Sequence, residues 1–273
     1  MKRGQVSVFI IIAIIIVAAG GSIAYILNNR DNDFSKNFFS SQGTKTGFDS
    51  LKASIINCMD KISYESLDTI SLQGGYYEKP EKNLDLGFLF IPYYYYEGKY
   101  LMPEKTKVEN EISKYINDNF PLCIKNIDSD FNIEIGNMNT KTAIKKGEVG
   151  FILNAPVTIT KDNNVVKLEL KDAPLNKKSY IYESMELARY ITDSHKQDPK
   201  LLCISCVAQL AEERNLYVNA FDLNDSSVLY IISENITSAE THYFEFVNKY
   251  PKRELEIAVI PGLPAGAYQD NEI

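Results

Sequence analysis

The sequence predicts an α+β protein: an N-terminal transmembrane or pilin-like helix followed by an extracytoplasmic domain with an antiparallel sheet and about four helices. Three observations support this. An uncharged apolar run fills residues 6–27, apolar residues recur at helical spacing in four later segments, and strand-like runs lie between and after them. We expect a signal, anchor or filament-core helix over 1–30, a stalk over 31–47, the α+β domain over 48–260 and a flexible tail over 261–273.

The apolar run at residues 6–27 is long enough to cross a membrane. At about 1.5 Å of rise per residue, such a helix spans a hydrocarbon core about 30 Å thick. Lys2 and Arg3 precede the run, so the positive-inside rule keeps the N-terminus in the cytoplasm and the later residues outside. Signal peptides have shorter apolar regions, yet Ala18, Ala19, Ser22 and Ala24 still offer a cleavage site. The sequence is therefore compatible both with a protein that keeps this segment as an anchor and with one that is released by cleavage.

The residues around the start of this run, Lys2-Arg3-Gly4-Gln5-Val6-Ser7-Val8-Phe9, resemble the class III signal sequence of archaeal type IV pilins. The resemblance implies that a membrane peptidase cuts between Gly4 and Gln5 and that the retained helix packs in a filament core. Phe9 departs from the pattern, since many pilins carry a glutamate at that place. We therefore expect either an extracellular filament or a membrane-anchored protein with an extracytoplasmic C-terminal domain.

Short segments elsewhere resemble an N-terminally anchored family of small-genome archaea. These segments are Asn57-Cys58-Met59, Leu72-Gln73-Gly74-Gly75-Tyr76, Tyr93–Tyr96, Phe120-Pro121-Leu122-Cys123 and Cys203-Ile204-Ser205-Cys206. The resemblance implies a cell-surface location and supplies no activity.

Helical spacing predicts four helices after the apolar run. The first is capped by Thr46 with Asp49 and stopped by Gly74-Gly75, and the second is capped by Thr106 with Glu109 and ended by Pro121. Two more follow, one over 180–191 and one beginning at Asp198-Pro199.

Strand-like runs predict the sheet. Residues 131–171 predict three or four antiparallel strands, with a hairpin turn at 161–164, and residues 217–223, 227–233 and 242–248 predict closing strands.

The four cysteines, Cys58, Cys123, Cys203 and Cys206, predict two disulfides because thiols outside the cytoplasm tend to be oxidised. The sequence does not separate the three possible connectivities, and we favour Cys58 with Cys123 and Cys203 with Cys206. Reactive Cys-x-x-Cys pairs usually lie at a helix N-terminus, which favours a thiolate. Here Asp198-Pro199 predicts an earlier helix start, and apolar neighbours indicate burial. Structural disulfides are therefore favoured over redox chemistry or a zinc site of four thiolates.

A tyrosine-rich stretch, Tyr93, Tyr94, Tyr95 and Tyr96, is the candidate partner-binding segment. Tyrosine has a flat apolar face and a polar tip, which suits a glycan or the surface of a partner cell. Strand alternation would instead pack half of these rings in a core that has no tryptophan. We favour packing and keep recognition as the alternative.

Charge and motifs narrow the function. All 36 acidic residues and all but two of the 29 basic residues follow the apolar run, so residues 28–273 carry a net charge of −9 and no nucleic-acid surface is expected. The sequence lacks histidine-rich metal spacing, nucleophile elbows and phosphate-binding loops, so we expect no enzyme, cofactor or metal site. Asn224-Asp-Ser and Asn235-Ile-Thr are glycosylation sequons.

We therefore expect a non-enzymatic structural protein of the cell surface, a pilin-like filament subunit or an anchored ectodomain. It would contact the membrane and form homo-oligomers through the N-terminal helix. The alternatives are a membrane-anchored adhesion module that uses the tyrosines and an extracytoplasmic thiol–disulfide oxidoreductase that uses Cys203 and Cys206.

Overall fold

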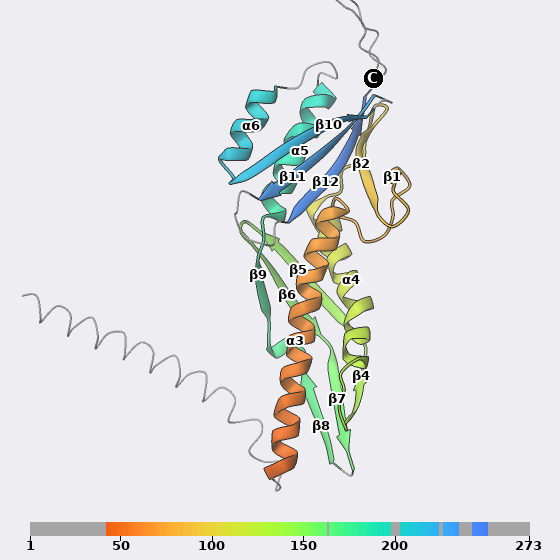
Figure 1. The fold of residues 1–273 in the computed structure, drawn as a ribbon, viewed down its shortest axis with the longest axis vertical. Helices are drawn as coiled ribbons and strands as arrows, with labels where there is room; N and C mark the ends of the chain where they lie inside the picture. Colours follow the sequence, from red (N-terminus) through yellow and green to blue (C-terminus); the bar gives the residue numbers. More distant parts are fainter. Residues whose placement is uncertain (1–41, 163, 198–202, 224–225, 235–241, 251–273) are drawn as a thin grey trace, which may run out of the picture. The chain divides into compact units, whose positions relative to one another are not determined.

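The computed structural model of the chain describes residues 42–162, 164–197, 203–223, 226–234 and 242–250. The predicted N-terminal helix with its processing site at Gly4 and Gln5, the sequons at Asn224 and Asn235, and the tail over 261–273 lie outside these residues. The described part is an α+β protein with four α-helices and antiparallel sheets (Figure 1), which confirms the coarse prediction of fold class. None of its helices is both long and apolar enough to cross a bilayer.

The chain divides into two compact units, residues 1–57 and 58–273. Helix α3 (Gln42–Leu72) begins in the first unit and ends in the second. It starts before the predicted cap at Thr46, so residues 42–47 of the expected stalk are helical. One stripe of its residues is buried, as an amphipathic helix requires: Phe48, Leu51 and Ile55 in the first unit and Met59, Ile62 and Ile70 in the second.

Helix α3 ends where the glycine pair predicts. Gly74 and Gly75 have φ values of +50° and +84°, which glycine adopts readily. The Gly75 amide donates a 2.7 Å hydrogen bond to the carbonyl of Ile70 and closes the last turn. A Cβ atom at Gly74 would lie 2.4 Å from the Glu245 carbonyl oxygen, so only glycine fits there.

Helix α4 (Lys105–Lys125) continues past Pro121, so the prediction that this proline ends the helix is wrong. Proline removes one backbone hydrogen bond from a helix interior. Burial of Phe120 and Ile124 on either side, and a disulfide at Cys123, offset that loss.

Two three-stranded antiparallel sheets follow α4. One has the order β4 (Asn132–Ile135), β7 (Pro156–Lys161), β8 (Asn164–Glu169), and the other β5 (Asn139–Lys145), β6 (Glu148–Asn154), β9 (Leu175–Lys178). Residues 131–171 thus hold five strands rather than three or four. Pro156 begins a new strand within a run that reads as continuous, and β5 was not among the predicted strands. The predicted hairpin at 161–164 joins β7 and β8. A short 3-10 helix, η1 (Leu170–Asp172), follows.

Polar contacts hold α4 on β5. The carboxylate of Glu109 accepts the Ile144 amide at 2.9 Å, and the side-chain oxygen of Asn117 accepts both the amide and the hydroxyl of Thr140 at 3.2 and 2.7 Å. These side chains cap the strand's hydrogen-bonding groups, so an edge that would otherwise be open is covered by a helix.

The third sheet has six strands and is mixed. They are β1 (Asn83–Asp85), β2 (Phe90–Tyr96), β3 (Lys99–Tyr100), β10 (Leu216–Leu223), β11 (Ser227–Glu234) and β12 (Tyr243–Lys249). Its order is β1-β2-β12-β11-β10, with β3 paired to β2. The three predicted closing strands are confirmed as β10, β11 and β12, and β12 pairs in parallel with β2. Helix α5 (Ile181–Gln197) contacts β12 and β2, and helix α6 (Ile204–Glu212) contacts β10 (Figure 1).

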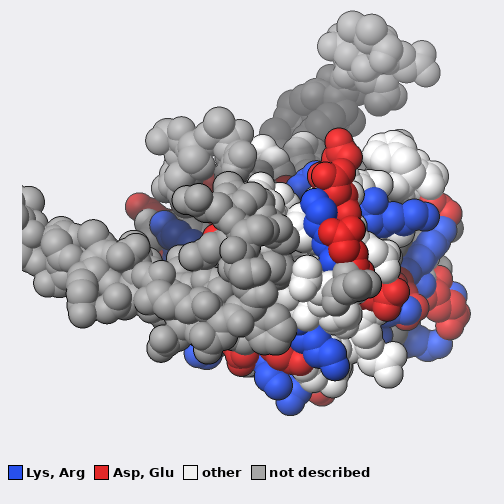
Figure 2. All heavy atoms as spheres, turned by 90° about the horizontal axis from the view of Figure 1, so that it is seen from below, with Lys and Arg blue, Asp and Glu red and all other residues white. Residues whose placement is uncertain are grey.

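Acidic and basic side chains lie interspersed on the described surface that Figure 2 shows, with no continuous field of either sign. Ion pairs such as Lys114 with Glu78 (2.6 Å) and Lys105 with Glu109 (2.9 Å) are spread over several elements.

Candidate functional site

The tyrosine stretch lies on β2, inside the sheet between β1 and β12. Tyr93, Tyr94 and Tyr95 are 8%, 0% and 5% exposed, and Tyr96 is half-buried. The structure therefore places three of the four rings in the packed interior, as we favoured from the sequence, and leaves only Tyr96 half-buried. Residues of both faces of β2 are buried, so alternation along the strand sends neighbouring rings into packed layers on opposite sides of the sheet.

Tyr94 is the centre of one of these layers. Its ring stacks on Phe246 with centroids 4.7 Å apart, and Phe246 stacks in turn on Tyr230 at 5.1 Å. The Tyr94 hydroxyl donates to the carbonyl of Gly74 at 2.9 Å, which ties the sheet to the end of α3. Burial raises the pKa of Tyr94 well above its ordinary value, so the group is a neutral donor.

The cysteines form the pairs that we favoured from the sequence. Cys58 on α3 and Cys123 on α4 are joined with an S–S distance of 2.06 Å and a sequence separation of 65. Cys203 and Cys206 are joined at 1.97 Å with a separation of 3. All four cysteines of the sequence are thereby oxidised, and no free thiol is present.

The two disulfides have different surroundings. Cys58 is 7% exposed within the packed α3 stripe. Cys203 and Cys206 are partly exposed, and the two residues between them, Ile204 and Ser205, are exposed, Ile204 at 76%. The predicted burial of the Cys-x-x-Cys pair is therefore wrong.

The predicted helix start before this pair is also wrong. Helix α6 begins at Ile204, and Cys203 is its N-cap residue. The Cys206 amide donates to the Cys203 sulfur at 3.3 Å, and the Val207 amide donates to the Cys203 carbonyl at 3.0 Å. The disulfide therefore lies at the positive end of a helix, which is the environment in which a sulfur becomes reactive.

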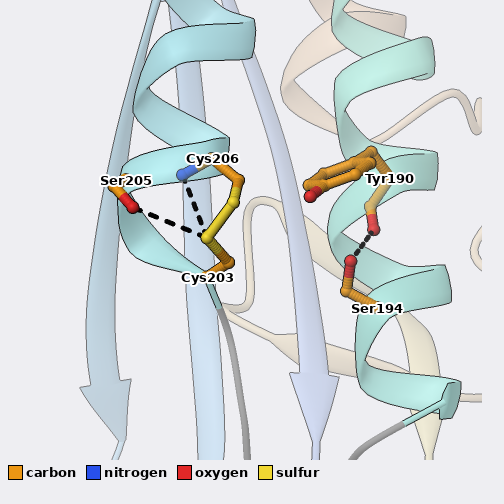
Figure 3. The surroundings of a disulfide bond; sticks show 5 residues. All are labelled: Tyr190, Ser194, Cys203, Ser205 and Cys206. Atoms are coloured by element: carbon orange, nitrogen blue, oxygen red, sulfur yellow. Dashed lines mark hydrogen bonds between the residues drawn. A yellow bond between two sulfur atoms is a disulfide. The ribbon is translucent and has the colours of Figure 1, made fainter.

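Helix α5 lies beside this disulfide. Figure 3 shows the ring of Tyr190, on α5, pointing toward Cys206, and the Ser194 hydroxyl donating to the Tyr190 carbonyl at 2.8 Å one turn later. The Ser205 hydroxyl lies 3.5 Å from the Cys203 sulfur on the other side.

A pocket of about 290 Å³ opens between α5 and the C-terminal end of α6. Seven residues line it: Glu186, Leu187, Arg189, Tyr190, Asp193, Leu210 and Arg214. Cys206 and Leu210 are four residues apart on α6, so they share one face of the helix. The pocket includes Leu210 toward the C-terminal end of that helix, whereas the disulfide lies at the N-terminal end.

The pocket was not predicted from the sequence, since its lining residues come from two segments with no motif spacing. No local signal marks the start of α6, since Leu201 and Leu202 continue the apolar spacing of the helix before Cys203. The Asp198-Pro199 pair, which predicts an earlier start, lies outside the described residues.

In the described part of the chain no group of three or more histidine, cysteine, aspartate and glutamate side chains is placed to hold a metal ion. His242 is instead paired through Nδ1 with the carboxylate of Asp68 at 2.5 Å and packs against the ring of Tyr64.

Comparison with known proteins finds no match to the chain among family models, curated proteins or solved structures.

Proposed function

We propose that the protein is a structural protein of the cell surface, whose N-terminal helix either anchors it in the membrane or packs in the core of a pilin-like filament. In both forms the helix holds the chain in place and the α+β domain faces outward. The proposal combines the apolar run and its basic flank with the way in which the folded domain is connected to the segment that follows that run.

The observation that carries the proposal is the covalent link between α3 and α4. The apolar run ends at Leu27, and α3 is the first described element after it. Cys58 begins the second unit and lies within α3, and its sulfur is bonded to Cys123 on α4. Helix α3 therefore stays attached to α4 at this point unless the Cys58–Cys123 bond breaks. Such a link stabilises a subunit that is fixed at its N-terminus against unfolding under load.

The oxidation of all four cysteines supports the outward location. Disulfides persist outside the cytoplasm and are rare within it. The topology inferred from Lys2 and Arg3 points the same way, because the positive-inside rule leaves residues after the apolar run outside.

The test is the intact mass and N-terminal sequence of the protein taken from membranes and from the cell surface. A mature chain that begins at Gln5 supports the filament form, and one that begins at Met1 supports the anchored form. A chain that begins near Tyr25 and is found in the medium contradicts both. Gly4→Val should block processing before Gln5, whereas the matched control Gly20→Val should leave it unchanged.

A further inference from the structure

We propose that the Cys203–Cys206 disulfide exchanges with the dithiols of other polypeptides, and that Cys203 is the sulfur that a substrate thiolate attacks. This activity goes beyond the structural role proposed above and does not depend on whether the N-terminal helix anchors or polymerises. It also departs from the expectation, drawn from the sequence, that the chain carries out no catalysis.

The first argument is the size of the loop that each disulfide closes. A disulfide stabilises a fold mainly by restricting the unfolded chain, and the effect grows with loop length. Cys58–Cys123 closes a loop with a sequence separation of 65, whereas the separation of Cys203 and Cys206 is 3. The short loop contributes much less to stability, so a structural role explains the first pair far better than the second.

The second argument is the position of Cys203 at the N-cap of α6. The amide of Cys206 already donates to the Cys203 sulfur at 3.3 Å in the oxidised form. After reduction the same amide and the positive end of the helix would stabilise a negatively charged sulfur at Cys203. Cys203 is therefore the better leaving group, while Cys206, within the first helical turn, is the resolving sulfur.

The third argument is access. Cys203 and Cys206 are partly exposed, and Ile204 between them is 76% exposed. The pocket between α5 and the C-terminal end of α6 presents cations from Arg189 and Arg214, anions from Glu186 and Asp193, and apolar surface from Leu187 and Leu210. A mixed lining of this kind suits a cysteine-containing polypeptide segment, whose backbone is polar and whose side chains vary, rather than a small thiol of one charge.

The exchange proceeds in two balanced steps. A substrate thiolate attacks the Cys203 sulfur, the bond to Cys206 breaks, and its electron pair goes to the Cys206 sulfur, which takes a proton. A second substrate thiolate then attacks the substrate sulfur of the mixed disulfide, and the Cys203 sulfur leaves as a thiolate. The substrate dithiol is oxidised to a disulfide, Cys203 and Cys206 are reduced by two electrons, and the remaining proton passes to Cys203 or to solvent.

The experiment uses the full-length chain in detergent and a fluorescent peptide with two cysteines. In the first assay, wild-type protein is mixed with the reduced peptide. In the second, the Cys206→Ser and Cys203→Ser variants are mixed with the same peptide in its oxidised, disulfide form. The trap runs the exchange in reverse: in Cys206→Ser the Cys203 thiolate attacks the peptide disulfide, and no Cys206 sulfur is present to release the peptide. This variant should therefore accumulate a mixed disulfide. Cys203→Ser is the matched control. Peptide mapping of Cys58–Cys123 in each sample reports whether that disulfide is consumed, and circular dichroism reports whether the fold is retained.

We expect wild type to oxidise about one peptide per chain, at a rate at least about tenfold higher than that of a variant that lacks both Cys203 and Cys206. We also expect Cys206→Ser to trap at least about tenfold more mixed disulfide than Cys203→Ser. Oxidation no faster than by the double variant, equal trapping by both single variants, or consumption of Cys58–Cys123 in place of Cys203–Cys206 would overturn the proposal. If a variant fails to fold, wild type is treated with limiting reductant and then alkylated, and peptide mapping shows which disulfide is reduced first. Cys203–Cys206 should open first, and prior opening of Cys58–Cys123 would refute the assignment.

Discussion

Removal of the Cys58–Cys123 disulfide should produce the largest loss of stability of any change at the four cysteines. Its sequence separation of 65 corresponds, by loop-closure entropy, to about 4 kcal/mol. The separation of 3 at Cys203–Cys206 corresponds to about 2 kcal/mol by the same relation. The double replacement of Cys58 and Cys123 by alanine should therefore cost about 2 kcal/mol more than the double replacement of Cys203 and Cys206.

The assay is urea unfolding of both double variants, as full-length chains in the same detergent, followed by tyrosine fluorescence. This signal suits a chain with 18 tyrosines and no tryptophan. The variant at Cys203 and Cys206 is the matched control, because it also loses two sulfurs and one bond. Equal losses in the two variants, or a larger loss at the short loop, would refute the reasoning that loop length separates a structural disulfide from a reactive one.

Three further changes test the packing of the six-stranded sheet. Tyr94→Phe leaves the carbonyl of Gly74 without its 2.9 Å donor and should lower the free energy of unfolding by about 1–2 kcal/mol, whereas Tyr93→Phe should change it by less than about 0.5 kcal/mol in the same denaturation assay. Gly74→Ala places a Cβ 2.4 Å from the Glu245 carbonyl oxygen at φ +50° and should lower the free energy of unfolding by more than about 2 kcal/mol. The control Gly87→Ala, at φ +84° with open space around it, should lower it by about 1 kcal/mol. Equal melting temperatures of the two variants would argue against the close approach at Gly74. Burial raises the pKa of Glu245 above its ordinary value of 4.5, so the folded state binds this proton more tightly and stability falls as pH rises through that range. Glu245→Gln should therefore gain stability relative to wild type between about pH 3 and about pH 7, and a gain that is independent of pH would contradict the shift.

Local signals predicted the elements that depend on local interactions. The Gly74-Gly75 pair ends α3 because its backbone conformation excludes other residues, and the three closing strands follow from their apolar runs. The exceptions arise from contacts distant in sequence. Pro121 stays within α4 because its neighbours are buried and Cys123 is bonded to a different helix.

The candidate site was harder to predict because the local signals favour an earlier helix start. Asp198-Pro199 predicts a start there, and Leu201 and Leu202 continue the apolar spacing, while α6 begins at Ile204. The parallel pairing of β2 with β12 could not be read from the sequence either, since these strands are far apart in the chain. Tyr93 and Tyr94 are buried on β2, in line with the packing that we favoured for this stretch.

One measurement tests the account most directly: the oxidation state of the cysteines in cells that are quenched with acid, alkylated and analysed by peptide mapping. The account predicts that Cys58–Cys123 is fully oxidised, in keeping with an extracytoplasmic structural bond, and that Cys203–Cys206 is recovered partly as a dithiol. Four free thiols would contradict the surface location and the structural proposal together. Complete oxidation of both pairs that persists when a membrane-impermeant dithiol is supplied to the cells would contradict the exchange activity alone.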